Sequence, residues 1–198
     1  GLGTDLVFHP DPAELYFPDA ATWVEVPALA KNLCAKTRPT HFRGVCTVVS
    51  KLFHIAAPDK AFFGQKDAQQ LAVIRRMVRD LNFDLEIVGC PIVREADGLA
   101  KSSRNTYLNP KERQAALVLN HSLKKAYSLV EAGETDTNKL LAVIKESIAA
   151  EPLAKLDYAE AVDADSMKPV ATVEGNVLFA IAVYIGKTRL IDNFVVSR

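Results

Sequence analysis

Apolar residues recur at helical spacing through the middle of the chain. Residues 45–55 carry a wide apolar face, and the stretch from Gln69 to Leu81 places an apolar side chain at every third or fourth position, a spacing that predicts amphipathic helices. Between them, the short run Ala61–Phe63 predicts the end of a buried strand, and residues 85–88 predict another strand. Strands that alternate with helices predict a parallel sheet covered on both faces.

The pattern is less regular before residue 45. Residues 4–8 and 23–26 are apolar or alternating and predict strands. Pro12 suits the first turn of a short helix through Tyr16, Pro27–Leu33 is compatible with another short helix, and residues 38–44 predict a polar loop. The strand-like start, without a polar lead-in, suggests a chain that begins inside a larger α/β domain. A cloning remnant ahead of a complete domain is the alternative.

The composition shifts near Arg94. Residues 94–107 are polar and predict a mobile connection. Asn109, Pro110 and Glu112 suit the start of a helix that would continue to a stop at Gly133. A second helix is expected from residues 136–137 to about 150, and residues 156–162, 176–184 and 188–193 predict strands. We therefore expect residues 1–94 to belong to a parallel-sheet α/β domain, and residues 95–198 to form a small α+β domain with an antiparallel sheet.

Two polar stretches carry the candidate chemistry. Gly64–Asp67 joins a predicted strand to a predicted helix, a geometry that directs backbone N–H groups and the positive helix end toward an anion. An ordinary corner with solvated charges would have the same pattern, because short glycine motifs occur often by chance. Lys101–Asn105 adds two hydroxyls and an arginine, which suit the oxygens of a polyphosphate. Both stretches follow strands at their carboxyl ends, so we expect them to meet at one crevice.

Composition excludes several classes of partner. The 198 residues contain 24 Lys and Arg against 24 Asp and Glu, so no net charge favours nucleic acid or a membrane surface. No apolar run is long enough to cross a bilayer. Cys34, Cys46 and Cys90 are widely spaced, which favours reduced thiols in a cytoplasmic protein over disulfides or a zinc site.

The two polar stretches, with the residues around them, identify a resemblance. Phe63–Leu71 and Arg94–Asn105 resemble the pantothenate synthetase family, as do His41–Phe53 and the closing Thr188–Asn193. The resemblance implies a homodimeric ligase that joins pantoate to β-alanine with ATP and Mg²⁺, through a pantoyl adenylate and release of pyrophosphate. It also implies a Rossmann-type nucleotidyltransferase domain in residues 1–94, followed by a lid domain in residues 95–198.

The resemblance also assigns roles to particular residues. Lys66 and Arg104 match the catalytic cations, Gln70 matches the residue that grips pantoate, and Val93 matches a backbone contact to adenine. The ATP-binding positions as a whole are Gly64, Gln65, Lys66, Asp67, Val93, Lys101, Ser102, Ser103 and Arg104. Arg38 and His41 are possible further contacts, with a plain loop role as the alternative for His41. Mg²⁺ would be held mainly by the ATP phosphates, with no cluster of side-chain ligands.

Three departures from the family pattern qualify these expectations. Gln65 stands where glutamate is usual, and Lys101 stands where leucine or methionine is usual. None of the four histidines lies in the His-x-Gly-His element that the family carries early in its first domain. We therefore expect a chain that lacks the N-terminal third of a family member and is weakly active or inactive alone. A related enzyme with a different acid substrate, or a non-catalytic fragment, remains an alternative.

Overall fold

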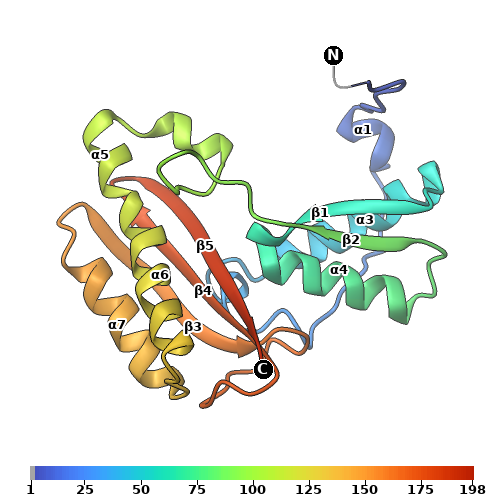
Figure 1. Cartoon of the computed structure of the whole chain (residues 1–198). Coiled ribbons are helices and arrows are strands. Elements are labelled where there is room, and N and C mark those ends of the chain that lie inside the picture. Colours follow the sequence, from blue (N-terminus) through green and yellow to red (C-terminus); the bar gives the residue numbers. More distant parts are fainter. Residues whose placement is uncertain (1–2) are drawn as a thin grey trace.

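The computed structural model describes residues 3–198 and consists of two halves that pack side by side (Figure 1). The first half contains the short helices α1 (Pro12–Leu15) and α2 (Cys34–Thr37), the long helix α3 (His41–Ala56), strand β1 (Lys60–Gly64), helix α4 (Ala68–Asp80) and strand β2 (Glu86–Cys90). β1 and β2 pair in parallel, with Phe62 opposite Val88. The predicted parallel pairing is therefore confirmed, and α4 lies along one face of the pair (Figure 1).

Several expectations for the first half are wrong. Residues 4–8 and 23–26 form no strand, because neither stretch pairs with another strand within residues 3–198. Leu6 is 82% exposed, and Trp23 packs under the guanidinium of Arg43 at 5.1 Å instead of entering a core. Residues 27–33 form turns, and α3 begins at His41, so part of the expected polar loop is helical.

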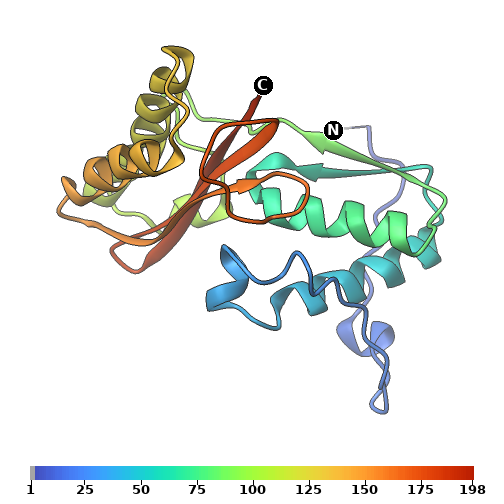
Figure 2. The ribbon, with the colours of Figure 1, turned by 90° about the horizontal axis from the view of Figure 1, so that it is seen from below.

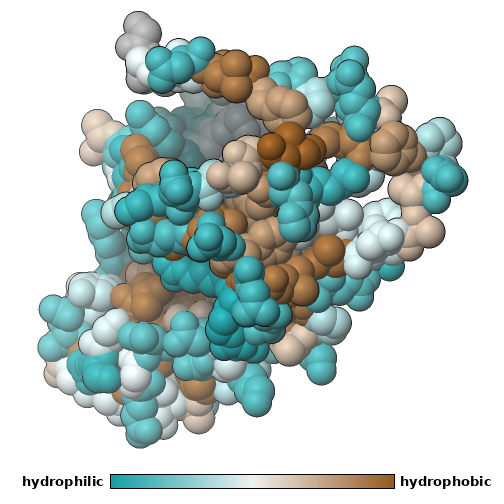
Figure 3. All heavy atoms as spheres, turned by 90° about the vertical axis from the view of Figure 1, so that its right-hand side faces the viewer, coloured by the Kyte–Doolittle hydropathy of each residue, from teal (hydrophilic) through white to brown (hydrophobic). Residues whose placement is uncertain are grey.

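Within residues 3–198, the parallel sheet is also covered by helices on one face only. Ala61 and Phe63 pack against the helices, whereas Phe62 is 66% exposed. The side chains of a strand alternate between its two faces, and α3 and α4 contribute their buried residues to the same cluster as Ala61 and Phe63. Seen from the side that lies on the right in Figure 1, hydrophobic residues interrupt the hydrophilic surface of the molecule (Figure 3).

The second half is the expected α+β unit. It contains α5 (Pro110–Ala115), α6 (Leu117–Glu131), α7 (Thr137–Ala149), β3 (Ala154–Asp163), β4 (Asn176–Ile185) and β5 (Thr188–Ser197), with the strands in the antiparallel order β3-β4-β5. Asn109 caps α5 in a capping box with Glu112, as predicted. The single helix expected from Asn109 to Gly133 is interrupted near Ala116, where α5 ends and α6 begins. The fold class predicted from the sequence is confirmed.

Strand β4 is the central strand of the second half and is buried on both faces. Phe179, Ile181 and Val183 belong to the cluster formed with α6 and α7, whereas Leu178 and Ala180 belong to the cluster formed with α3 and α4. This division follows the two-residue period of a strand. Figure 2 shows the antiparallel sheet between α6 and α7 on one side and the first half on the other. One face of the sheet therefore packs against its own helices, and the other face holds the first half in place.

The connection over residues 94–107 is anchored by polar contacts. Arg94 forms a bidentate ion pair with Asp192 of β5 at 2.7 and 3.0 Å. Asn105, in the 3₁₀ turn η2 (Ser103–Tyr107), donates to the side chain of Glu95 at 2.8 Å and to the carbonyl of Ala100 at 3.1 Å. These contacts fix the connection in the present conformation, and its mobility stays a prediction. Within residues 3–198, no helix has the length and hydropathy needed to cross a membrane.

Candidate active site

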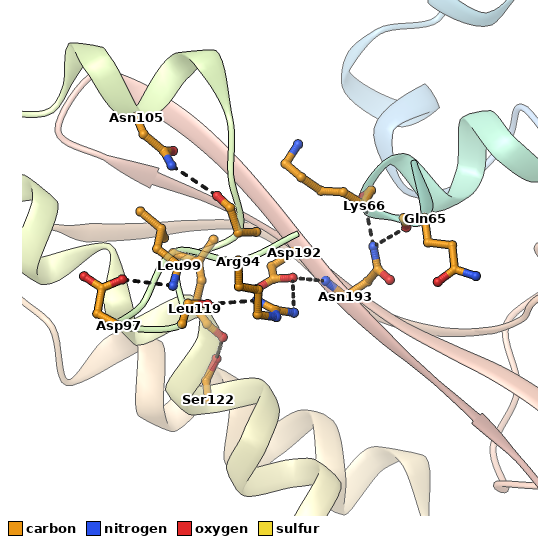
Figure 4. A network of polar contacts seen from close by, with 12 residues as sticks. Gln65, Lys66, Arg94, Asp97, Leu99, Asn105, Leu119, Ser122, Asp192 and Asn193 are labelled. Carbon is orange, nitrogen blue, oxygen red and sulfur yellow. Dashed lines mark hydrogen bonds and ion pairs between the residues drawn. The ribbon is translucent and has the colours of Figure 1, made fainter. Parts of the chain in front are cut away.

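A turn at the carboxyl end of β1 forms the centre of the site. The 3₁₀ turn η1 (Gln65–Asp67) connects Gly64 to α4. The Nδ2 atom of Asn193 in β5 donates to the carbonyl oxygens of Gln65 at 3.0 Å and Lys66 at 2.9 Å (Figure 4). The Lys66 turn is therefore fixed from the second half of the molecule.

Gly64 has an ordinary extended backbone, with φ −70° and ψ 132°. Its glycine identity is thus not required by conformation. A Cβ atom added there would meet nothing within 4 Å, so Gly64 borders open space. Close approach of a ligand to this backbone stays a prediction.

The second polar stretch lies across from the Lys66 turn. Ser102 caps η2, and its Oγ accepts from the backbone N–H of Arg104 at 3.3 Å. The backbone N–H of Lys101 donates to the carbonyl of Val93 at 2.9 Å. These bonds give Ser102 and Arg104 defined positions relative to the end of β2.

Two cavities meet at Lys66 and Asp67. The first, here called the Arg104 cavity, has a volume of about 210 Å³ and is also lined by Arg38, His41, Gln70 and Arg104. The second, the Ser102 cavity, has a volume of about 380 Å³ and is also lined by Gly64, Val93, Lys101 and Ser102. Most of the site residues predicted from the sequence therefore lie around one pair of adjoining cavities.

Two of the predicted residues lie elsewhere. The side chain of Gln65 points away from that of Lys66 (Figure 4) and lines a cavity on the other side of the turn. Ser103 is exposed and lines neither the Arg104 cavity nor the Ser102 cavity. The side chains of Gln65 and Ser103 are thus not brought together with Lys66.

The site is electrostatically positive. The side chain of Lys66 is only 16% exposed, and its Nζ lies 3.6 Å from the carboxylate of Asp67. Burial, and next the positive charge of Arg38, lower the pKa of His41 below 6.5; Asp67 opposes this shift and Arg104 adds to it. His41 is therefore a neutral imidazole at neutral pH. The charge available for binding an anion comes from the lysine and the arginines.

Some supporting residues were not singled out in the sequence. Gln69 is 5% exposed, and its side chain bonds the carbonyls of Leu29 and Asn32 and the backbone N–H of Cys34 at 2.8 to 3.0 Å. These bonds attach the segment before α3 to α4. The sequence contained a signal for this buried role, because helical spacing places Gln69 one turn before the apolar Val73 and therefore on the inner face of α4.

The opposite wall of the Arg104 cavity comes from the second half. Tyr158 lies 3.2 Å from the sulfur of Cys34, and Arg189 forms an ion pair with Asp157 at 2.7 Å. Burial raises the pKa of the Tyr158 hydroxyl, which therefore stays protonated. This wall offers a neutral donor and a guanidinium already paired with a carboxylate.

Comparison with solved structures establishes the class of protein. The fold matches pantothenate synthetase from Thermus thermophilus with a TM-score of 0.90 and 41% sequence identity, over 97% of this chain and 70% of that chain. It also matches pantoate-β-alanine ligase from Francisella tularensis, described as complexed with β-γ ATP and β-alanine, with a TM-score of 0.62 and 31% identity over 90% of this chain and 60% of that chain. The fold is that of a group of ligases.

Sequence comparison narrows the class to one family. A family model described as pantoate-β-alanine ligase matches residues 1–195. The pantothenate synthetase of Clostridium acetobutylicum is 58% identical over 192 residues, which are 97% of this chain and 68% of the relative. That of Clostridium novyi is 59% identical over 193 residues, again covering 68% of the relative. The chain belongs to the pantoate-β-alanine ligase family, as the resemblance in its sequence indicated.

Proposed function

We propose that the site serves the ATP-dependent condensation of pantoate with β-alanine, giving pantothenate, AMP and pyrophosphate. The observation that carries this proposal is the position of Lys66, which lines both the Arg104 cavity and the Ser102 cavity. One cation can therefore contact phosphate groups that extend from one cavity to the other. Membership in the ligase family and the named complex of the Francisella protein with β-γ ATP and β-alanine support the same assignment.

In the first step, a carboxylate oxygen of pantoate attacks the α-phosphorus of ATP. An oxygen–phosphorus bond forms, and pyrophosphate leaves with the electron pair of the broken bond, which gives pantoyl adenylate. Lys66 and Arg104 stabilise the negative charge that develops on the phosphate oxygens. Gln70 holds pantoate in the Arg104 cavity, with Arg38 and His41 beside it. The Ser102 cavity takes the nucleotide, with Val93 at the adenine and Gly64, Asp67, Lys101 and Ser102 around the remainder.

In the second step, the amine of β-alanine attacks the acyl carbon of the adenylate. A carbon–nitrogen bond forms, the bond between the acyl carbon and the phosphate oxygen breaks, AMP leaves with its electron pair, and the amine nitrogen releases a proton to water. No side chain has to act as a nucleophile, because the carboxylate of pantoate supplies the attacking oxygen in the first step. The protein contributes orientation and fixed positive charge.

The donors around the site fit a magnesium ion held chiefly by phosphate. Residues 3–198 contain no group of three or more His, Cys, Asp or Glu side chains placed to bind a metal. Asp67 offers one carboxylate at the junction of the two cavities, with its side chain 49% exposed. Mg²⁺ is commonly bound through one or two carboxylates together with substrate phosphates. Bound there, it would neutralise phosphate charge next to Lys66.

Three finer expectations belong to the same proposal. Residues 1–94 and 95–198 act as nucleotide-binding domain and lid, and the protein works as a homodimer in the cytoplasm. The family's His-x-Gly-His element is not among the 198 residues, so this chain alone binds Mg-ATP weakly and is weakly active or inactive. Analytical ultracentrifugation tests the dimer, and hydrogen exchange of residues 94–107 with and without ATP tests closure of the lid.

Pantoate-dependent exchange between ATP and pyrophosphate tests the reaction, because it requires only the first step. We expect Lys66→Ala and Arg104→Ala each to lower exchange by about 10²- to 10³-fold, the loss typical of removing a charge-stabilising donor. Lys60→Ala is the matched control, since Lys60 starts β1 and pairs with the exposed Glu86 at 2.9 Å. Exchange that depends on another carboxylic acid and not on pantoate would favour the related enzyme instead. Absence of Mg-ATP binding in a calorimetric titration would favour the non-catalytic fragment.

A further inference from the structure

A cavity of about 410 Å³ lies on the opposite side of the Lys66 turn from the Arg104 cavity. We call it the Arg75 cavity. It lies between α4, the segment after β2 and the end of β5, and Asn193 lines both it and the Arg104 cavity. Its apolar wall comes from both halves of the molecule and includes Leu71, Ile92, Leu178 and Phe194. A cavity with this volume and wall can enclose the hydrocarbon part of a small molecule.

Two polar side chains converge at one edge of the Arg75 cavity. A Cβ atom built on Gly89 would lie 2.9 Å from Nη2 of Arg75 and 3.5 Å from Nε2 of Gln65. The guanidinium and the amide therefore approach the same point above strand β2, close to the backbone of Gly89. Within residues 3–198, neither side chain takes part in an ion pair or a side-chain hydrogen bond, because the bond between Asn193 and Gln65 uses the backbone carbonyl of Gln65; both side chains line the cavity. Their N–H groups are available to a ligand.

We propose that the Arg75 cavity is a second binding site, for a small carboxylate with an apolar body. The guanidinium of Arg75 and the amide of Gln65 donate to the carboxylate, and the hydrocarbon part lies against Leu71 and Phe194. A guanidinium matches the planar carboxylate group and forms charge-assisted hydrogen bonds with it. The carboxylate of Asp165 lines the same cavity, which disfavours a doubly charged anion such as phosphate. The site goes beyond the proposed reaction, which uses the two cavities on the other side of the turn.

Binding of hexanoate tests the site directly, with hexanamide as the neutral probe of equal length. We expect hexanoate to bind with an affinity on the order of millimolar, and hexanamide to bind far more weakly. Arg75→Gln should lower the affinity for hexanoate by about ten- to a hundredfold, which is the effect of losing a charged hydrogen-bond donor. Arg79→Gln is the matched control, because Arg79 lies one turn further along α4 and pairs with Asp80. Ligand-observed nuclear magnetic resonance or calorimetry measures the affinity of both ligands for the wild type and the affinity of hexanoate for both variants.

Two further variants separate this site from the Arg104 cavity and from misfolding. Asp165→Asn removes a negative charge that repels the carboxylate of hexanoate and should therefore strengthen hexanoate binding. A misfolded variant would not bind hexanoate more strongly. Arg104→Ala should leave hexanoate binding unchanged, although it lowers exchange activity if the proposed function is correct. Equal hexanoate binding by the wild type and Arg75→Gln overturns the proposal. Equal binding of hexanoate and hexanamide, loss of binding in Arg104→Ala alone, or no binding of hexanoate to the wild type also overturns it.

Discussion

Replacing Asn193 with alanine is expected to release the Lys66 turn from the antiparallel sheet. The substitution removes two hydrogen bonds, from Nδ2 to the carbonyl oxygens of Gln65 and Lys66 at 3.0 and 2.9 Å. Each neutral hydrogen bond contributes about 0.5–1.5 kcal/mol net, so the free energy of unfolding should fall by about 1–3 kcal/mol. Asn193 is 5% exposed, but it borders two cavities, so water that reaches the two carbonyl oxygens would move the loss toward the lower end of this range. The same change should weaken Mg-ATP binding, because Lys66 loses part of its support.

Urea unfolding of Asn193→Ala beside Asn138→Ala measures the effect on stability. Asn138 is exposed in α7, and its side chain makes no hydrogen bond within residues 3–198, so its truncation is the matched control. Asn193→Asp keeps the shape of the side chain but replaces the donor with an acceptor that faces two carbonyl oxygens, and it should be at least as destabilising as alanine. If Asn193→Ala and Asn138→Ala unfold at the same urea concentration and bind Mg-ATP equally, the turn does not depend on Asn193.

Three further outcomes are expected. Arg94→Gln should destabilise the protein more than Asp192→Asn, because it leaves unpaired the carboxylate of Asp192, whose side chain is only 1% exposed, whereas Asp192→Asn leaves Arg94, whose side chain is 28% exposed. Breaking a buried ion pair costs about 3–5 kcal/mol. Equal losses of stability in urea unfolding would contradict this order. Because the pKa of His41 is lowered from 6.5 in the folded chain, the unfolded chain binds more protons below that pH, and stability falls as the pH drops through this window. His41→Gln should therefore lose less stability than the wild type from about pH 7 to about pH 5, and parallel stability profiles would exclude a contribution from His41. Asn109→Ala removes the hydrogen bond that the Asn109 side chain accepts from the backbone N–H of Glu112 at the start of α5. It should lower the free energy of unfolding by about 1 kcal/mol, seen as a reduced Tm. An unchanged Tm would show that α5 does not depend on its cap.

The elements predicted well from the sequence are those whose side chains keep one period over a long stretch. α4 shows helical spacing from Leu71 to Val78, and both residues are buried. β4 carries apolar residues at consecutive positions, as expected for a strand covered on both faces. The cap at Asn109 was also readable, and the second cap was narrowed to residues 136–137, of which the structure has Asp136 as the cap; a cap depends on residues three or fewer positions away. Each of these signals is local.

Two of the wrong expectations concern pairing between distant parts of the chain. The stretches at residues 4–8 and 23–26 have strand-like composition, but a strand requires a neighbour to satisfy its backbone groups. The exposed Phe62 likewise shows that an apolar side chain does not reveal which face of a sheet is covered. At the candidate site, local motifs predicted Lys66 and Arg104, and the structure places both at the Arg104 cavity. Asn193 was not, because it acts on carbonyl groups 127 and 128 residues away in the sequence.

Strand β5 connects both halves of the candidate active site through two adjacent residues. Asp192 binds Arg94, at the start of the segment that leads to Arg104, and Asn193 binds the Lys66 turn (Figure 4). Adjacent residues of a strand point to opposite sides, so one strand can hold two separate segments at a defined spacing. The carboxylate of Asp192 also accepts the backbone N–H of Asn193 at 2.8 Å, which joins the two contacts into one network. The relative position of Lys66 and Arg104 is therefore set by β5, and a change in this strand alters both sides of the cavity together.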